Sequence, residues 1–146
     1  MSDKTLYTAE AHVTGGRAEG HGTTTDGALE VDLRLPTEMG GQGGGTNPEQ
    51  LFAVGYASCF EGAIGVVARR KRVEAGDVEI DSKVNLHPTG DGGFKLSVEL
   101  HVQLPQASAE DAKEIVALSH QVCPYSNATR GNIDVVLTAN GEAVDA

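Results

Sequence analysis

The sequence predicts an α+β protein with about six antiparallel strands and two main helices, and three observations support this. Several stretches alternate apolar and polar residues, as strands with one buried face do. A nearly continuous apolar stretch over residues 51–68 follows a helix-start signal, and a second helical pattern follows Ser108. The length of 146 residues suits one hydrophobic core, so we expect a single domain over residues 1–146.

Charge and composition argue against several classes of protein. The 21 acidic and 11 basic side chains give a net charge of −10, which repels phosphate backbones and anionic membranes, so we expect no nucleic-acid partner. The first ten residues hold no apolar stretch of secretory length, which predicts a cytoplasmic protein with reduced thiols. Aromatic residues make up only 4%, so part of the apolar burial is expected to come from a partner chain.

The N-terminal third predicts a meander of about three strands. Alternating apolar residues at 7–13 and 29–35 indicate two of them. Gly15-Gly16 supplies a turn after the first stretch, and Asp26-Gly27 supplies one before the second. A polar loop over residues 37–46, with five glycines, then leads toward the first helix.

That helix is expected to begin at Pro48. Asn47 is a good N-cap, proline suits the first helical position, and Gln50 stands where a capping box places Glu or Gln. Of residues 51–68, 13 of 18 are apolar and only Glu61 is charged, so the helix is expected to be buried at the centre of the fold. A membrane span competes, but Glu61 and the surrounding amphipathic strands argue against it.

A stripe of small residues runs along the same helix. Gly55, Ser58, Gly62 and Gly65 share one face and allow another helix to approach closely. The helix ends in the basic run 69–72. We interpret these residues as stabilising the negative C-terminal end of the helix dipole and aiding solubility, and not as a nucleic-acid patch.

The C-terminal half predicts a hairpin, a helix and a last strand. Alternation at 78–86 and 94–104 indicates two strands, with a turn at 89–93. Ser108 caps an amphipathic helix that reaches Val122. Residues 132–139 predict the last strand, and the acidic tail is expected to fray.

Motifs for common cofactors are weak or missing. The glycine loop lacks the dinucleotide fingerprint and the P-loop ending, which argues against nucleotide binding. The histidines stand at positions 12, 21, 87, 101 and 120, are expected to be mostly solvated, and show no metal-ligand spacing, so we expect no metal. His120 and Cys123 lie one helical turn apart, so a Cys-His hydrolase is conceivable, but no orienting group or oxyanion hole accompanies them.

The two cysteines leave two interpretations open. Cys59 lies within the apolar helix and Cys123 precedes a proline at the end of the second helix, 64 residues away. They are redox partners only if the fold brings the two helices together. Otherwise they are two small buried hydrophobic residues, a common role for free cysteine.

Several local sequences carry a resemblance. Residues 47–53 (NPEQLFA), 55–60 (GYASCF) and 122–129 (VCPYSNAT), with 35–41 (LPTEMGG), resemble the organic hydroperoxide resistance subfamily of the OsmC superfamily. The resemblance covers essentially the whole chain. It implies an OsmC-like fold in an intertwined homodimer, with about six antiparallel strands wrapped around long central helices.

The resemblance also implies a function. The function implied by the resemblance is that of a thiol peroxidase, which would reduce organic and fatty-acid hydroperoxides to alcohols in defence against oxidative stress. Cys59 matches the peroxidatic cysteine and Cys123 the resolving cysteine, which form a disulfide, while Arg17 and Glu49 match the residues that activate the thiol. No bound cofactor is implied, and the expected reductant is dihydrolipoamide carried on lipoylated proteins. The alternative is a non-enzymatic lipid or small-molecule binding module that uses the same apolar pocket.

Physical chemistry supports a need for such helpers. A thiol of ordinary pKa is only ~3% ionised at pH 7, and apolar burial lowers that fraction further, so a nearby cation such as Arg17 is needed. Glu49 and Cys59 are ten residues apart, which is about 15 Å along one continuous helix. Either the partner chain supplies part of the Arg17–Glu49 pair, or the helix breaks near Gly55.

Overall fold

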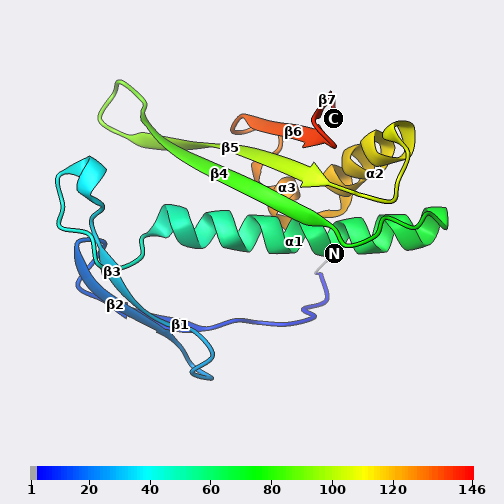
Figure 1. The fold of residues 1–146 in the computed structure, drawn as a ribbon. Helices are drawn as coiled ribbons and strands as arrows, with labels where there is room; N and C mark the ends of the chain where they lie inside the picture. The colour runs from blue at the N-terminus through cyan, green and yellow to red at the C-terminus, as the bar shows by residue number, and fades with distance from the viewer. Residues whose placement is uncertain (1–2) are drawn as a thin grey trace. The chain divides into compact units, whose positions relative to one another are not determined.

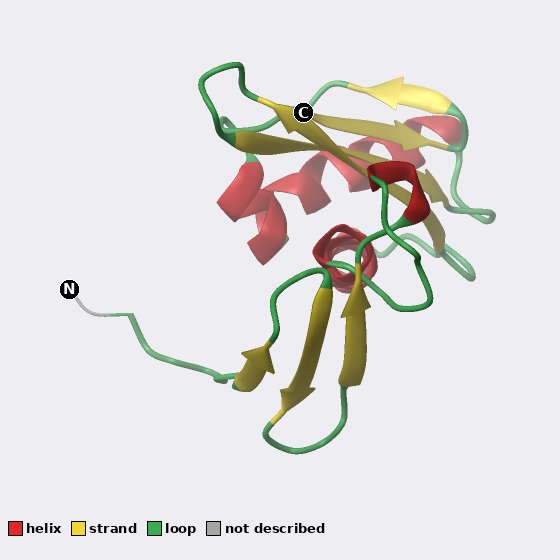
Figure 2. Ribbon diagram, turned by 90° about the vertical axis from the view of Figure 1, so that its left-hand side faces the viewer, coloured by secondary structure: helices red, strands yellow, loops and turns green. Residues whose placement is uncertain are grey.

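The computed structural model describes residues 3–146. They form two compact units, one ending at Leu51 and one from Phe52 to Ala146. Figure 1 follows the chain through its elements in order, and Figure 2 separates helices from strands. The prediction of one domain over residues 1–146 stays a prediction.

The first unit contains the predicted three-stranded meander. Its strands run antiparallel in the order β1-β2-β3, as the sequence indicates. Their bounds are β1 Ala11–Thr14, β2 Glu19–Thr24 and β3 Glu30–Arg34, and a short 3-10 helix, η1, covers Thr37–Met39. The first strand is shorter than the alternation at 7–13 predicts, because residues 7–10 have no strand partner here.

Glycine fixes the turn between β1 and β2. Gly15 and Gly16 have positive φ angles of 78° and 69°, a region that glycine enters without strain. A Cβ on Gly15 would lie 2.4 Å from the carbonyl oxygen of Glu19, and one on Gly20 would lie 1.9 Å from that of Gly16. The backbones therefore approach too closely for side chains at these positions. Arg17 lies in this turn.

The long helix α1 spans Pro48–Lys71 and begins where the sequence predicts. The Gln50 amide donates to Asn47 Oδ1 at 2.8 Å, which confirms the N-cap. The Gln50 side chain accepts from the Thr46 hydroxyl, a contact made in place of the reciprocal capping-box bond. The helix continues without interruption through Gly55, so the break considered near that residue is wrong.

Only one face of α1 is buried within the described chain. The buried residues follow helical spacing: Tyr56, Phe60, Ala63, Ile64, Val67 and Ala68. Val54 on another face is 71% exposed, and a Cβ on Gly62 or Gly65 would meet no atom within 4 Å. The expectation of burial on all sides is therefore wrong for this chain alone. By length and composition α1 could cross a membrane, but its buried face belongs to a hydrophobic core.

The second unit has a four-stranded sheet in the order β4-β5-β6-β7. The strands are β4 Glu79–Pro88, β5 Phe94–Gln103, β6 Val135–Ala139 and β7 Glu142–Val144. The predicted hairpin is confirmed and most strand pairs are antiparallel, as expected, but β5 and β6 run parallel and differ from the prediction in this one pairing. Two helices separate these strands in sequence, and such a crossover returns the chain in the same direction. The tail also pairs as β7 and is not frayed, contrary to expectation.

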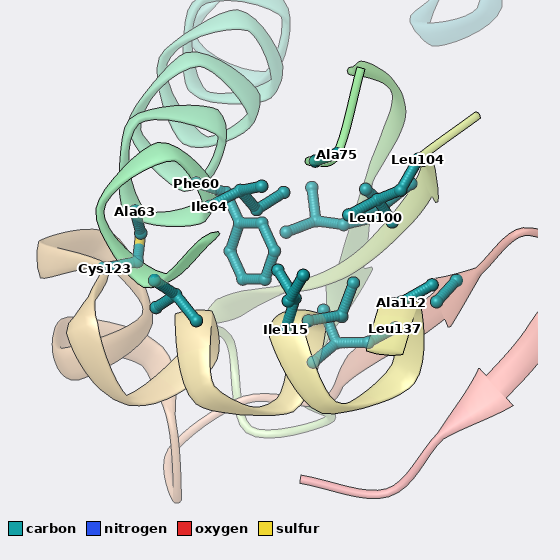
Figure 3. Packing of buried hydrophobic residues seen from close by; sticks show 14 of the residues in the cluster. Phe60, Ala63, Ile64, Ala75, Leu100, Leu104, Ala112, Ile115, Cys123 and Leu137 are labelled. Atoms are coloured by element: carbon teal, nitrogen blue, oxygen red, sulfur yellow. The ribbon is translucent and has the colours of Figure 1, made fainter. Parts of the chain in front are cut away.

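Helices α2 and α3 pack with α1 on one face of this sheet (Figures 1 and 2). Helix α2 spans Ala109–Val122, and Ser108 caps it as predicted, accepting from the Asp111 amide. Helix α3 spans Pro124–Thr129. Figure 3 shows how Phe60 and Ile64 of α1, Leu100 of β5 and Ile115 of α2 meet in the core. Cys123 belongs to the same cluster.

Candidate active site

The fold brings the two cysteines into contact. The Sγ atoms of Cys59 and Cys123 lie 3.6 Å apart, and both thiols are free. Cys123 is completely buried, and Cys59 is partly buried. A disulfide bond is ~2.0 Å long, so a shift of less than 2 Å would join the two sulfurs. The condition for redox partnership, that the fold joins the two helices, is met.

Local structure places each sulfur. Cys59 lies in the middle of α1, on the side that packs against the core. Cys123 lies between α2 and α3 with extended backbone angles, φ −64° and ψ 124°, and its amide donates to Ser119 O at the end of α2. Pro124 then starts α3, where the missing amide hydrogen costs nothing. Cys123 therefore lies at a bend between two helices.

The surroundings of Cys59 within its own unit disfavour the thiolate. Burial raises the pKa of the Cys59 thiol above its ordinary value. A hydrogen bond from the backbone N–H of Tyr125 acts in the opposite direction, and the neighbouring Cys123 adds to the rise. A thiolate nucleophile at neutral pH therefore needs a further stabilising charge.

Aromatic rings stand next to the cysteines. The rings of Phe52, Tyr56 and Tyr125 form a triangle with centroid distances of 5.6 to 5.8 Å. Gly55 allows this, because a Cβ there would lie 2.9 Å from the Tyr125 hydroxyl oxygen. The small-residue stripe thus admits α3 at Gly55. The backbone N–H of Tyr125 reaches Cys59, and the partly exposed Tyr125 ring suits an organic ligand better than a small polar one.

The other two predicted site residues form an ion pair within the first unit. One nitrogen, Arg17 Nη2, donates to both carboxylate oxygens of Glu49, at 2.8 and 2.7 Å. Glu49 is held in the first turn of α1, and Arg17 in the glycine turn. Arg17 Nε is buried and has no hydrogen-bond partner. The pair therefore retains a donor that a ligand oxygen or a sulfur could use.

Sequence reasoning missed part of the surroundings of the cysteines. His120, expected in solvent, is only 3% exposed. Its Nδ1 lies 2.8 Å from the Ser126 hydroxyl, and within residues 3–146 it makes no hydrogen bond to Cys123, so the conceivable Cys-His pair is not formed. Ser126 also contacts the buried Tyr56. Tyr56, His120 and Ser126 each stand three residues from a cysteine, and this spacing was the sequence signal that could have placed them beside the sulfurs.

A metal site and a cavity elsewhere were the other candidates within residues 3–146. Among residues 3–146, no group of three or more His, Cys, Asp or Glu side chains could hold a metal ion. A cavity of about 590 Å³ is lined by residues of β5, β6 and their neighbours, including His87, Ser97 and Asp134, and neither cysteine lines it.

Comparisons with known proteins identify the family of this chain. The profile of the OsmC-like protein family matches residues 41–138. An organic hydroperoxide resistance protein of Xanthomonas axonopodis pv. citri is 52% identical over 138 residues, covering 93% of this chain and 96% of that protein. Another from Bacillus subtilis is 48% identical, covering 90% and 96%. The crystal structure of an organic hydroperoxide resistance protein from Legionella pneumophila superposes with a TM-score of 0.89 at 52% identity, covering 93% of this chain and 98% of that one.

Proposed function

The chain belongs to the organic hydroperoxide resistance proteins of the OsmC family, and on that premise we propose that it is a thiol peroxidase that reduces organic hydroperoxides to alcohols. One observation carries the proposal: two free thiols from helices 64 residues apart in sequence lie 3.6 Å apart. Their contact explains both cysteines at once, which neither a hydrolase nor a simple binding module does. Fatty-acid hydroperoxides are the expected substrates, because the rings beside Cys59 are apolar.

The proposed cycle has three steps. The Cys59 thiolate attacks the terminal peroxide oxygen, the O–O bond breaks, and the departing alkoxide takes a proton to become the alcohol, which leaves a sulfenic acid on Cys59. The Cys123 thiolate then attacks the Cys59 sulfur, and hydroxide leaves as water after taking a proton. A dithiol finally reduces the disulfide through a mixed disulfide and becomes a cyclic disulfide itself. We infer dihydrolipoamide on lipoylated proteins as that dithiol.

We assign activation of the thiol to Arg17 and Glu49. Burial raises the pKa of Cys59, and a guanidinium about 4 Å from a thiolate contributes roughly 4 kcal/mol at an effective dielectric of 20. Two units of pKa correspond to about 2.7 kcal/mol, so one such cation can offset a rise of that size. The bond to Glu49 fixes the orientation of Arg17, and the unpaired Nε provides a donor.

We infer that the pair acts across a homodimer. Glu49 and Cys59 stand ten residues apart on the uninterrupted α1, about 15 Å along its axis. The exposed apolar part of α1, at Val54, Gly62 and Gly65, offers a surface for a second copy. A cytoplasmic location, as the sequence predicts, would keep both thiols reduced between cycles.

A mixing experiment tests the shared site. Chains carrying Cys59→Ser and chains carrying Glu49→Ala are each expected to be inactive, while their heterodimer recovers one working site if the pair acts across the interface. Mixtures with no recovered activity would refute that arrangement. Wild-type homodimers treated identically provide the control for reassembly.

The function itself is tested by mass spectrometry of the reduced protein after one equivalent of cumene hydroperoxide. We expect the loss of two hydrogens and a peptide crosslink between Cys59 and Cys123 within seconds. Two unchanged thiols would refute the peroxidase and favour the binding module, as would a Cys59→Ser variant that still protects cells. Similar second-order rates for cumene hydroperoxide and hydrogen peroxide would contradict the organic preference.

A further inference from the structure

A set of buried polar side chains lies beside the cysteine pair without a role in the steps above. The Tyr56 hydroxyl is 2.7 Å from Ser126 Oγ, and Ser126 Oγ is 2.8 Å from His120 Nδ1. The Thr129 hydroxyl lies 3.1 Å from that of Tyr56. Tyr56 and Ser126 are fully buried. We call Tyr56, Ser126 and His120 the buried hydroxyl-imidazole network.

The network surrounds the cysteines in sequence and in space. Tyr56 precedes Cys59 by three residues on α1, and His120 precedes Cys123 by three residues on α2. Ser126 follows Cys123 by three residues on α3. Residues three apart on a helix lie on neighbouring positions of one face. The hydrogen bonds therefore tie together the three helices that carry or flank the two sulfurs.

Side-chain contacts, among them the packing of Tyr125 on Gly55, anchor the bend that holds Cys123 to α1. Helix α3 has six residues, and the backbone at Cys123 is extended. A guanidinium nitrogen of Arg130 donates to the His120 carbonyl at 2.7 Å, which satisfies an acceptor near the end of α2. Among the side chains of α3, within residues 3–146, that of Ser126 alone hydrogen-bonds to both α1 and α2, through Tyr56 and His120.

The network consists of neutral groups. Burial raises the pKa of Tyr56, partly opposed by its hydrogen bonds to Ser126 and Thr129. Burial lowers the pKa of His120, and the charge of Arg130 lowers it further. Apolar side chains would fill these positions without the desolvation of polar groups. Directional bonds add what apolar packing lacks, which is a defined orientation of the helices.

We propose that the buried hydroxyl-imidazole network is a positioning device for the disulfide step. It holds the Cys123 sulfur in line with Cys59 and so sets how fast a Cys59 sulfenic acid becomes a disulfide. The rate of the first step, attack of Cys59 on peroxide, does not depend on it. This inference rests on the two-cysteine cycle proposed above.

The test compares Ser126→Ala with Ser119→Ala. Ser119 is an equally buried serine on α2 whose hydroxyl bonds only to the Ile115 carbonyl, outside the network. Each reduced variant receives one equivalent of cumene hydroperoxide with dimedone, which traps sulfenic acid. For Ser126→Ala we expect disulfide formation to slow by about tenfold or more, since a misplacement near 1 Å can cost a hundredfold. Trapped Cys59 should increase, while the rate of peroxide consumption and all rates of Ser119→Ala stay near wild type.

A second variant separates positioning from loss of stability. Tyr56→Phe keeps the ring in the core and removes only the hydroxyl, and we expect it to slow the same step. If the residues act as one unit, the double variant Tyr56→Phe/Ser126→Ala should be no slower than the slower single variant.

Three outcomes would overturn the inference. These are disulfide formation in Ser126→Ala as fast as in Ser119→Ala, an equal slowing of peroxide consumption, or fully multiplicative effects in the double variant. A wild-type protein that forms no crosslink would refute the two-cysteine cycle instead, so the two failures are distinguishable.

Discussion

The contact between Gly55 and Tyr125 yields a quantitative prediction about the packing of α1 and α3. A Cβ at position 55 would lie 2.9 Å from the Tyr125 hydroxyl oxygen, and 3.4 Å from the nearest two ring carbons. The first distance is too short for van der Waals contact, and the second is ordinary. Gly55→Ala therefore sets a clash with one atom against the better helix propensity of alanine.

The two contributions have known sizes. Alanine in place of glycine inside a helix stabilises by roughly 1 kcal/mol. Overpacking costs about 1–3 kcal/mol, and Tyr125, at 37% exposure, can move its hydroxyl outward, which keeps the cost toward the lower half of that range. We expect Gly55→Ala to lower the free energy of unfolding by about 0–1 kcal/mol. In a Tyr125→Phe background the clashing oxygen is gone, and the same substitution should raise it by roughly 1 kcal/mol.

Urea unfolding of the four reduced proteins, at one protein concentration, measures this coupling. The midpoints should shift while the slope of free energy against urea stays constant. The double-mutant cycle should give a coupling of about 1–2 kcal/mol. Equal stabilisation by Gly55→Ala in both backgrounds would show that Tyr125 does not pack on Gly55, and would refute the reasoning.

Three further predictions concern the ion pair, pH and assembly. Arg17→Met removes the charge that stabilises the Cys59 thiolate, so Cys59 oxidation should slow by about tenfold or more at pH 7. Raising the pH should restore part of the rate. Stopped-flow measurements that show an unchanged pH profile would contradict this. Burial lowers the pKa of His120 in the folded protein. Above about pH 6.5 this histidine is mostly neutral in both the folded and the unfolded protein. As the pH falls below that value, the unfolded protein binds the proton first, so the free energy of unfolding decreases. His120→Gln should lose less stability than wild type between pH 7.5 and 5 in urea titrations, and equal losses would exclude His120 as the cause. Gly62→Leu should shift the protein from dimer to monomer in light scattering, because the bare helix face there is the proposed contact with a second copy; an unchanged dimer would place the interface elsewhere.

The sequence by itself determined the local elements. Asn47 and Ser108 are N-caps that act through the next three residues, and Gly15 and Gly27 adopt positive φ angles in turns. Such signals depend on neighbouring residues, so they can be recognised without the fold. The long apolar stretch also predicted a core helix, although not which of its faces the chain covers. The resemblance to a known family named both cysteines, Arg17 and Glu49 before any geometry was available.

Only the tertiary structure decided which segments that are distant in sequence come into contact. Sulfurs 64 residues apart in sequence touch because α1 crosses the bend between α2 and α3, and no local pattern contains that crossing. The parallel pairing of β5 with β6 likewise depends on the path of two intervening helices. His120 is expected in solvent with the other histidines, yet it is buried and contacts Ser126, which comes from another helix. Burial depends on packing between elements, which the periodicity of one element cannot report.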